Sequence, residues 1–454
     1  MKRKPFISSA LATVAIVAVT SMIVSSCSGT PNVPTDTTHL AEFNKLTNSE
    51  SINPMDNNLS LYVDYSNCIT QGMQSPFYQS MVSPLTAATK NYMSIKGDAI
   101  TKEEGDVYTL LNNVEEVNYA ALDKAINMMA DGDSESVLLT DGELFTQTAT
   151  KNNPNNPYMH EAFKKWILKG HDIHILAEPY IETYKGQQFN KKRFYIIFTD
   201  DRLLGNVYSR IKEVVDLSSF PQVDEFHLSG NYPWSLQDNG VQSKPNENLA
   251  AETKGYNTFE IQDWPLDWKT IQAVIMQAYD EETGEPKENG DPLITGLTVN
   301  RNAFGAYRIK DIDVKVYNIN SEYFDIYNSL EAGEKVGPKA FDFMELPDFI
   351  TYDEKEFNRH SKVNLYFDVE DFAPDKTQLN GNPYNYFKIV ISVGEIENVV
   401  DNHTDLFKFD SIVQGGQTNV SIAESLKNCV FDPEIINNLQ GKVLYTIYVK
   451  SEKY

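Results

Sequence analysis

The sequence has few cysteines and none of the common catalytic motifs. Only three of its 454 residues are cysteine, which excludes the disulfide framework that stabilises small secreted domains. No glycine-rich phosphate loop, Gly-x-Ser-x-Gly elbow, His-Glu-x-x-His or Cys-x-x-Cys motif occurs. The usual sequence signatures of nucleotide binding, serine hydrolysis, zinc proteolysis and dithiol redox chemistry are therefore missing.

Basic residues are also scarce. Lysine and arginine number 39 against 64 aspartates and glutamates, which gives a net charge of −25. Proteins that bind nucleic acids or polyanionic glycans do so mainly through clustered basic side chains, so neither is an expected partner. Such an acidic surface suits an extracellular protein that binds divalent cations.

The start of the chain has the pattern of an export signal. Met1-Lys-Arg-Lys4 precedes an apolar run over residues 10–24, which is short for a membrane span. The run ends in Val24-Ser-Ser-Cys27, which resembles the lipobox of bacterial lipoproteins, and Asp36-Thr37-Thr38 resembles an O-glycosylation motif of Bacteroidota. The resemblance implies removal of residues 1–26, acylation of Cys27 and anchoring in the outer membrane, facing the periplasm or the outside.

Hydrophobic periodicity divides the rest of the chain. Residues 27–57 are polar and without periodicity, which predicts a flexible tether. Strand and helix patterns alternate over residues 58–250, which indicates an α/β domain with a mostly parallel, doubly wound sheet. From residue 251 apolar residues recur at every second position, as in half-buried strands. This favours two β-sandwich domains, 251–345 and 346–454, with one large sandwich as the alternative.

Two apolar runs of the α/β region end in oxygen side chains. Residues 59–63 lead into Asp64-Tyr-Ser66-Asn-Cys68, and residues 136–139 lead into Thr140-Asp141-Gly142. The carboxyl ends of parallel strands meet at the crevice where α/β folds bind ligands. Carboxylate and hydroxyl oxygens are preferred by Mg²⁺, Ca²⁺ and Mn²⁺. The sequence therefore predicts a divalent cation between these strand ends.

The two motifs resemble the metal-ion-dependent adhesion site of von Willebrand factor A domains, in which Asp-x-Ser-x-Ser and Thr-Asp-Gly follow two strands. The resemblance implies that Asp64, Ser66 and Asp141 bind Mg²⁺, with Mn²⁺ or Ca²⁺ as alternatives. It places Glu116, or in a looser register Asn118, where the family has a threonine, and Cys68 where the family has a serine. A thiol is a poor partner for a hard cation. The alternative is a domain of this fold that has lost its metal and whose aspartates cap helices.

Other polar residues are interpreted as structural. His171 and His174 lie on opposite faces of a predicted strand, so their spacing does not bring them together on a zinc ion. Asp200 and Asp201 follow a further apolar run, at the same predicted edge as Asp141. We interpret them as a helix cap in preference to ligands.

These observations favour an envelope-anchored binding or adhesion lipoprotein. The resemblance implies that its cation keeps one coordination position open for an acidic side chain of a protein or cell-surface ligand. No catalytic base accompanies the site, so an enzyme is the less favoured class. Two alternatives stay open: a metal-dependent hydrolase or phosphoesterase, which a second cluster of Asp and His ligands would support, and a metal-free structural subunit of an envelope assembly.

Overall fold

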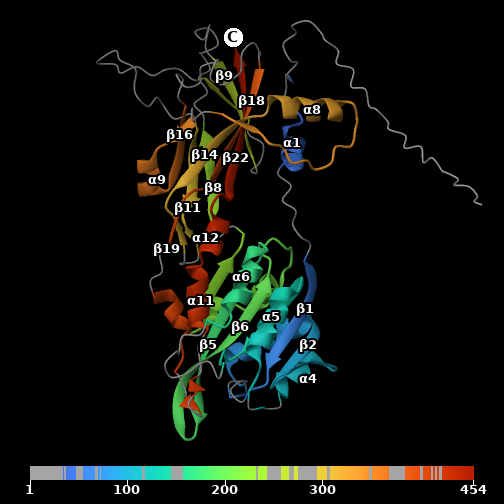
Figure 1. Cartoon of the computed structure of the whole chain (residues 1–454), viewed down its shortest axis with the longest axis vertical. Coiled ribbons are helices and arrows are strands. Elements are labelled where there is room, and N and C mark those ends of the chain that lie inside the picture. The colour runs from blue at the N-terminus through green and yellow to red at the C-terminus, as the bar shows by residue number, and fades with distance from the viewer. Residues whose placement is uncertain are drawn as a thin grey trace, which may run out of the picture.

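The structure is a computed structural model that describes most of the chain between residues 34 and 453. The described residues are 34, 37–47, 55–66, 70–71, 73–114, 117, 119–144, 157–231, 234–242, 257–264, 270–274, 294–303, 307–346, 350–367, 384–398, 402–410, 413–414, 417–418 and 422–453. In Figure 1 an α/β unit lies in the lower part of the molecule and a β-rich unit in the upper part.

A seven-stranded sheet forms the centre of the α/β unit, in the strand order β3-β2-β1-β4-β6-β5-β7. Its strands are β1 (Asp56–Asp64), β2 (Thr89–Lys96), β3 (Ala99–Glu103), β4 (Ser134–Thr140), β5 (Asp172–Tyr184), β6 (Gln187–Thr199) and β7 (Asp224–Ser229). Strand β1 pairs in parallel with β2 and β4, whereas the other pairings are antiparallel. The predicted α/β class is confirmed, but the sheet is mixed and not mostly parallel.

A tight turn explains this difference. Lys185 and Gly186 alone connect β5 to β6, and their φ angles are 47° and 78°. A two-residue turn with both φ angles positive joins antiparallel strands, so the chain returns beside β5 without a helical crossover. Strand β6 consequently runs antiparallel to β4. Asp200 and Asp201 therefore lie at the end of the sheet opposite Asp141, and the prediction that they share its edge is wrong.

Helices cover both faces of this sheet. Helices α3 (Pro76–Ala88), α4 (Val107–Asn112) and α7 (Val207–Val214) pack on one face, and α5 (Leu122–Asp131) and α6 (His160–Leu168) on the other. Side chains of β4 alternate between the two layers, with Val137 and Leu139 on the α3 side and Leu138 on the α5 side. This alternation follows from the twofold periodicity of a strand.

The upper unit consists of antiparallel sheets. The largest has the order β10-β9-β22-β18-β14-β15, and others have the orders β16-β17-β11-β8 and β12-β13-β19. The strands are β8 (Ser235–Gln242), β9 (Asn257–Trp264), β10 (Thr270–Val274), β11 (Ile294–Asn300), β12 (Asn302–Ala303), β13 (Tyr307–Ile309), β14 (Ile312–Asn318), β15 (Met344–Glu345), β16 (Ile350–Tyr352), β17 (Lys362–Phe367), β18 (Tyr384–Val393), β19 (Ile396–Asn398) and β22 (Val443–Lys453). The helices α8 (Asn320–Glu331) and α9 (Glu354–His360) also belong to the upper unit, whereas the short pair β20 (Val413–Gln414) and β21 (Gln417–Thr418) lies in the lower part of the molecule (Figure 1).

The predicted boundaries within the β-rich region need correction. Strands from the ranges 251–345 and 346–454 are direct neighbours in the six-stranded sheet, since β18 lies between β14 and β22. The two ranges therefore build common sheets and do not form separate sandwiches. Strand β8, from the range assigned to the α/β domain, also pairs with β11 of this unit.

Part of the predicted all-β region is helical and belongs to the α/β unit. The segments η3 (Asn402–Phe407), α11 (Ala423–Val430) and α12 (Pro433–Leu439) follow β19, and both α11 and α12 pack against α6. The backbone N–H of Met159 donates to Ser425 Oγ at 3.1 Å. His160 Nε2 lies 2.9 Å from Asp432 Oδ2. The chain thus returns to the lower unit before β22 enters the upper one.

The N-terminal segment is folded where a tether was predicted. Helix α1 (Leu40–Thr47) packs against α8 (Figure 1), and Phe43 is fully buried in a cluster with Tyr323. Pro34 is also buried, and the range 27–57 is therefore not flexible throughout. Cys27 lies outside the described residues. None of the helices in the described part of the chain combines the length and the apolar character needed to cross a bilayer.

Candidate metal sites at the two ends of the α/β sheet

The first candidate site lies where β1 and β4 end. The two strands are parallel neighbours in which Val63 is paired with Leu139, so Asp64 and Asp141 come together at one end of the sheet. This is the contact that the sequence predicted.

The other predicted ligands are only partly described. Ser66 follows two residues after Asp64 and is half-buried, whereas Glu116, Asn118 and Cys68 lie outside the described residues.

Short hydrogen bonds fix both carboxyl groups. Asp64 accepts from the backbone N–H of Ser66 through Oδ1 and from the hydroxyl of Thr140 through Oδ2, each at 2.7 Å. Asp141 accepts from the backbone N–H of Glu143 at 2.9 Å. The side chains of Ser66 and Asp141 also hydrogen-bond to Asp64. The orientation of the carboxyl groups is therefore set by the residues that follow each strand, and neither group caps a helix of the described chain.

Both carboxyl groups are shielded from water. Asp64 is 1% exposed and Asp141 is 2% exposed. Burial raises the pKa of Asp64, and its hydrogen bonds offset only part of that shift. Burial and the charges of Asp64 and Glu143 raise the pKa of Asp141 well above its usual range. Two carboxyl groups in contact cannot both be anions at low cost, so this pair must hold either a proton or a cation.

The surroundings close the site. Glu143 forms an ion pair with Lys191, which is 1% exposed and also donates to the carbonyl oxygen of Asp410 at 2.8 Å. The hydroxyl of Tyr158 donates to the carbonyl oxygen of Gly142 at 2.9 Å. The φ angle of Gly142 is +68°, and a Cβ atom there would lie 2.8 Å from the ring of Phe194. The turn after β4 is therefore tightly enclosed.

The second candidate site lies at the opposite end of the sheet. His174 of β5 is paired with His227 of β7, and their rings stack with centroids 3.9 Å apart and planes at 20°. Tyr208 of α7 stacks on the other face of His174 at 3.6 Å. Sequence reasoning missed this cluster because His227 lies far along the chain and its strand, β7, was not foreseen beside β5.

Two aspartates face the stacked histidines. His174 Nε2 lies 2.9 Å from Asp201 Oδ1, and His227 Nε2 lies 3.6 Å from Asp201 Oδ2 and 2.9 Å from Asp172 Oδ1. Donor atoms of His174, Asp201 and His227 all lie within 4.8 Å of one another. Burial lowers the pKa of His174, and the charge of His227 acts in the same direction. The residues could therefore hold a metal that accepts both nitrogen and oxygen ligands.

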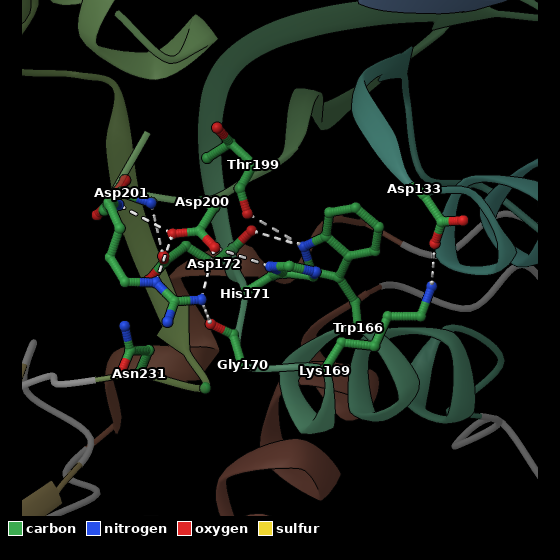
Figure 2. A network of polar contacts seen from close by, with 12 residues as sticks. Asp133, Trp166, Lys169, Gly170, His171, Asp172, Thr199, Asp200, Asp201 and Asn231 are labelled. Atoms are coloured by element: carbon green, nitrogen blue, oxygen red, sulfur yellow. Dashed lines mark hydrogen bonds and ion pairs between the residues drawn. The ribbon is translucent and has the colours of Figure 1, made fainter. Parts of the chain in front are cut away.

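A neighbouring network holds the turn that carries Asp201 (Figure 2). His171 Nδ1 lies 2.9 Å from Asp200 Oδ2, and Arg202 Nη2 donates to the same oxygen at 2.8 Å. Burial acts to raise the pKa of Asp200, but these hydrogen bonds hold it below its usual range. Asp172 Oδ2 accepts from the backbone N–H of Asp201 at 2.8 Å. The start of the turn is thus tied to Asp172 of β5 and to His171, which directly precedes that strand.

The structure also tests the interpretation of these residues from sequence. Helix α7 is capped by Asn206, whose side chain accepts from the N–H of Ser209 at 2.8 Å, so the helix-cap interpretation of Asp200 and Asp201 is wrong. His171 and His174 hydrogen-bond to different carboxylates, which agrees with the prediction that their spacing does not bring them together on one ion.

Known proteins give no further information on the fold or on either site. Comparison of the chain with protein-family models, with curated proteins and with solved structures finds no match.

Proposed function

We propose that this protein is an envelope-anchored binding lipoprotein whose α/β unit holds a divalent cation between Asp64, Ser66 and Asp141. The cation is Mg²⁺, with Mn²⁺ or Ca²⁺ as substitutes, because the donors are carboxylate and hydroxyl oxygens. The partner is a protein or a cell-surface ligand that offers an acidic side chain. No nucleic acid is involved, given the net charge of −25.

The buried contact between Asp64 and Asp141 is the observation that carries the proposal. The two side chains are at most 2% exposed and their pKa values are raised, most of all by burial. A divalent cation would neutralise both charges and replace the proton that the pair otherwise needs. The oxygens come from adjacent strand ends, where the parallel pairing of β1 and β4 holds them without any rearrangement of the sheet.

Partner binding requires a further step. Because both carboxyl groups are buried, a partner side chain can reach the cation only after neighbouring side chains move. Tyr158 is one such neighbour, because its hydroxyl donates to the carbonyl oxygen of Gly142 and because burial and the charges of Asp141 and Asp64 raise its pKa. We therefore expect affinity for the partner to depend both on the cation and on displacement of Tyr158.

A distant relationship to von Willebrand A domains is part of the proposal. The parallel pairings of β1 with β2 and β4, together with Asp64 and Asp141 at the strand ends, support it. The antiparallel strands β6 and β7 depart from the mostly parallel sheet of that family.

A metal-dependent hydrolase is the second candidate, and one observation favours it. The cluster of His174, Asp201 and His227 is the kind of second ligand set that such an enzyme needs. It lies at the opposite end of the sheet from Asp141, however, so the two sets do not form one metal centre. The binding function therefore remains the better supported.

Thermal unfolding with and without Mg²⁺ tests the cation site. At a free concentration about 100 times the Kd, Mg²⁺ should stabilise the full chain by about 2.7 kcal/mol, and chelator should reverse the effect. Asp141→Asn should abolish this response while keeping the fold, since an amide retains the acceptor for the N–H of Glu143. Asp133→Asn is the matched control because that side chain is 93% exposed. An Mg²⁺ response of equal size in Asp141→Asn would contradict the proposal.

A further inference from the structure

The cluster at the other end of the sheet has a donor set of a different chemical kind. Two imidazole nitrogens and a carboxylate oxygen suit Zn²⁺ and other divalent transition metals, whereas Mg²⁺ and Ca²⁺ prefer oxygen alone. His174 and His227 are buried, with side chains 4% and 6% exposed. Buried histidines beside carboxylates on three separate segments of chain are a recognised form of metal site.

The distances are close to those of a bound ion. Zn²⁺ binds nitrogen and oxygen at about 2.0–2.2 Å, so ligand atoms of a tetrahedral site lie about 3.3 Å apart. His174 Nε2 is 2.9 Å from Asp201 Oδ1, and His227 Nε2 is 3.6 Å from Asp201 Oδ2. All three donor atoms fall within 4.8 Å of one another. Movements of about 1 Å would therefore bring them to bonding positions.

The structure also indicates which side chains must move. An ion lies in the plane of each imidazole that binds it, and stacked rings 3.9 Å apart cannot share one ion in this way. Tyr208 holds the other face of His174 at 3.6 Å, so His227 is the ring that turns. Asp201 can follow because its side chain is 42% exposed, and that exposure also gives an ion a route of entry.

We propose that His174, His227 and Asp201 bind one divalent transition-metal ion of the Zn²⁺ class, through the two Nε2 atoms and a carboxylate oxygen. Asp172 is a positioning residue, because its Oδ2 accepts from the N–H of Asp201. Its Oδ1 lies 2.9 Å from His227 Nε2, a contact that is lost when this nitrogen binds the ion. Three protein ligands leave a fourth position for water. This site is independent of the proposed cation site at Asp64 and Asp141.

Zn²⁺ titration of the metal-free full chain, in competition with a chromophoric chelator, tests the inference. The wild-type protein should bind one Zn²⁺ that excess Mg²⁺ does not displace. Asp201→Asn and His227→Gln should each weaken that binding at least tenfold. His171→Gln is the matched control. His171 directly precedes β5, the strand that carries His174, but its ring contacts Asp200 and not Asp201. Circular dichroism establishes that each variant is folded, and Asp201→Asn is the primary variant because its side chain is partly exposed.

The same titration separates this inference from the proposed function. Zn²⁺ binding should be unchanged in Asp141→Asn, whose Mg²⁺ response is lost. If Zn²⁺ affinity is retained in folded Asp201→Asn but lost in Asp141→Asn, the ion occupies the other end of the sheet and the inference is overturned. Failure of the wild-type chain to bind a stoichiometric Zn²⁺ ion overturns it as well, whatever the result with Mg²⁺.

Discussion

The hydroxyl of Tyr386, on β18, donates a hydrogen bond to the carbonyl oxygen of Pro34 at 2.7 Å. This contact fixes the N-terminal segment to the upper end of the β-rich unit, beside α1 and α8 (Figure 1). Only the stretch from residue 27 to residue 34 separates Cys27 from this contact, and it spans at most about 25 Å when fully extended. A lipid on Cys27 would therefore keep the β-rich end near the bilayer.

The first prediction concerns this orientation. In lipidated protein on vesicles, a dye at Asp325→Cys in α8 should transfer energy efficiently to labelled lipid headgroups, because α8 lies at the end of the molecule where Pro34 is held. A dye at Lys185→Cys, in the turn between β5 and β6, should transfer little, since the α/β unit lies at the other end of the molecule (Figure 1). Both positions are exposed, and a Cys68→Ser background avoids labelling at that thiol. Equal transfer from the two positions would rule out the proposed orientation.

The second prediction concerns the turn after β4. Gly142→Ala should destabilise the protein by about 2–4 kcal/mol, because it adds the strain of a positive φ angle to a close contact with Phe194. Gly186→Ala is the control, since its φ angle is +78° but nothing lies within 4 Å of the added atom. That variant should lose only about 1–2 kcal/mol. Chemical denaturation measures both, and equal losses would show that the turn is not enclosed as described.

The third prediction concerns Lys388 in β18, which is 6% exposed. Burial lowers the pKa of Lys388 from 10.5 to about 8. Between pH 8 and pH 10.5 the lysine is mostly protonated in the unfolded chain but mostly neutral in the folded chain. This residue therefore makes the free energy of unfolding rise with pH over that range. Below pH 8 the lysine is charged in both states, and the full cost of burying that charge lowers the free energy of unfolding. Lys388→Met should therefore increase the free energy of unfolding by about 2 kcal/mol at neutral pH.

Urea denaturation near pH 7 and near pH 10 measures this effect. The gain from Lys388→Met should shrink at the higher pH, where the lysine of the folded wild-type protein is already neutral. Lys315→Met on the neighbouring strand β14 is the control, since that side chain is 47% exposed. If the two variants behave alike at both pH values, the burial of Lys388 has no consequence for stability.

The contact between Asp64 and Asp141 could be predicted from the sequence because both residues follow continuous apolar runs. Such runs identify buried parallel strands, and the ends of such strands meet. The direction of β6 could not be predicted in the same way. Its run of apolar residues fits a strand of either direction, and only the Lys185-Gly186 turn decides it. That dipeptide was the available signal, since a glycine in a two-residue connection favours a hairpin.

The second site and the return of the C-terminal helices escaped prediction for a related reason. His174 and His227 meet only because β7 pairs with β5, and strand pairing depends on distant residues. Helices α11 and α12 lie between strand patterns, and their apolar residues, such as Leu426 and Val430, are buried against the α/β unit and not in a sheet. Local periodicity thus identified many of the strands, but it missed these helices and did not show which strands pair.

Crystals of the full chain grown with Mn²⁺ would show directly whether a cation lies between β1 and β4, because anomalous scattering identifies that ion. We predict an anomalous peak between the carboxyl groups of Asp64 and Asp141, with the hydroxyl of Ser66 as a further ligand. A peak confined to His174 and His227 would concern the second site alone. If Asp64 and Asp141 remain in direct contact with no peak between them, the cation-dependent binding function is contradicted and the metal-free structural subunit replaces it.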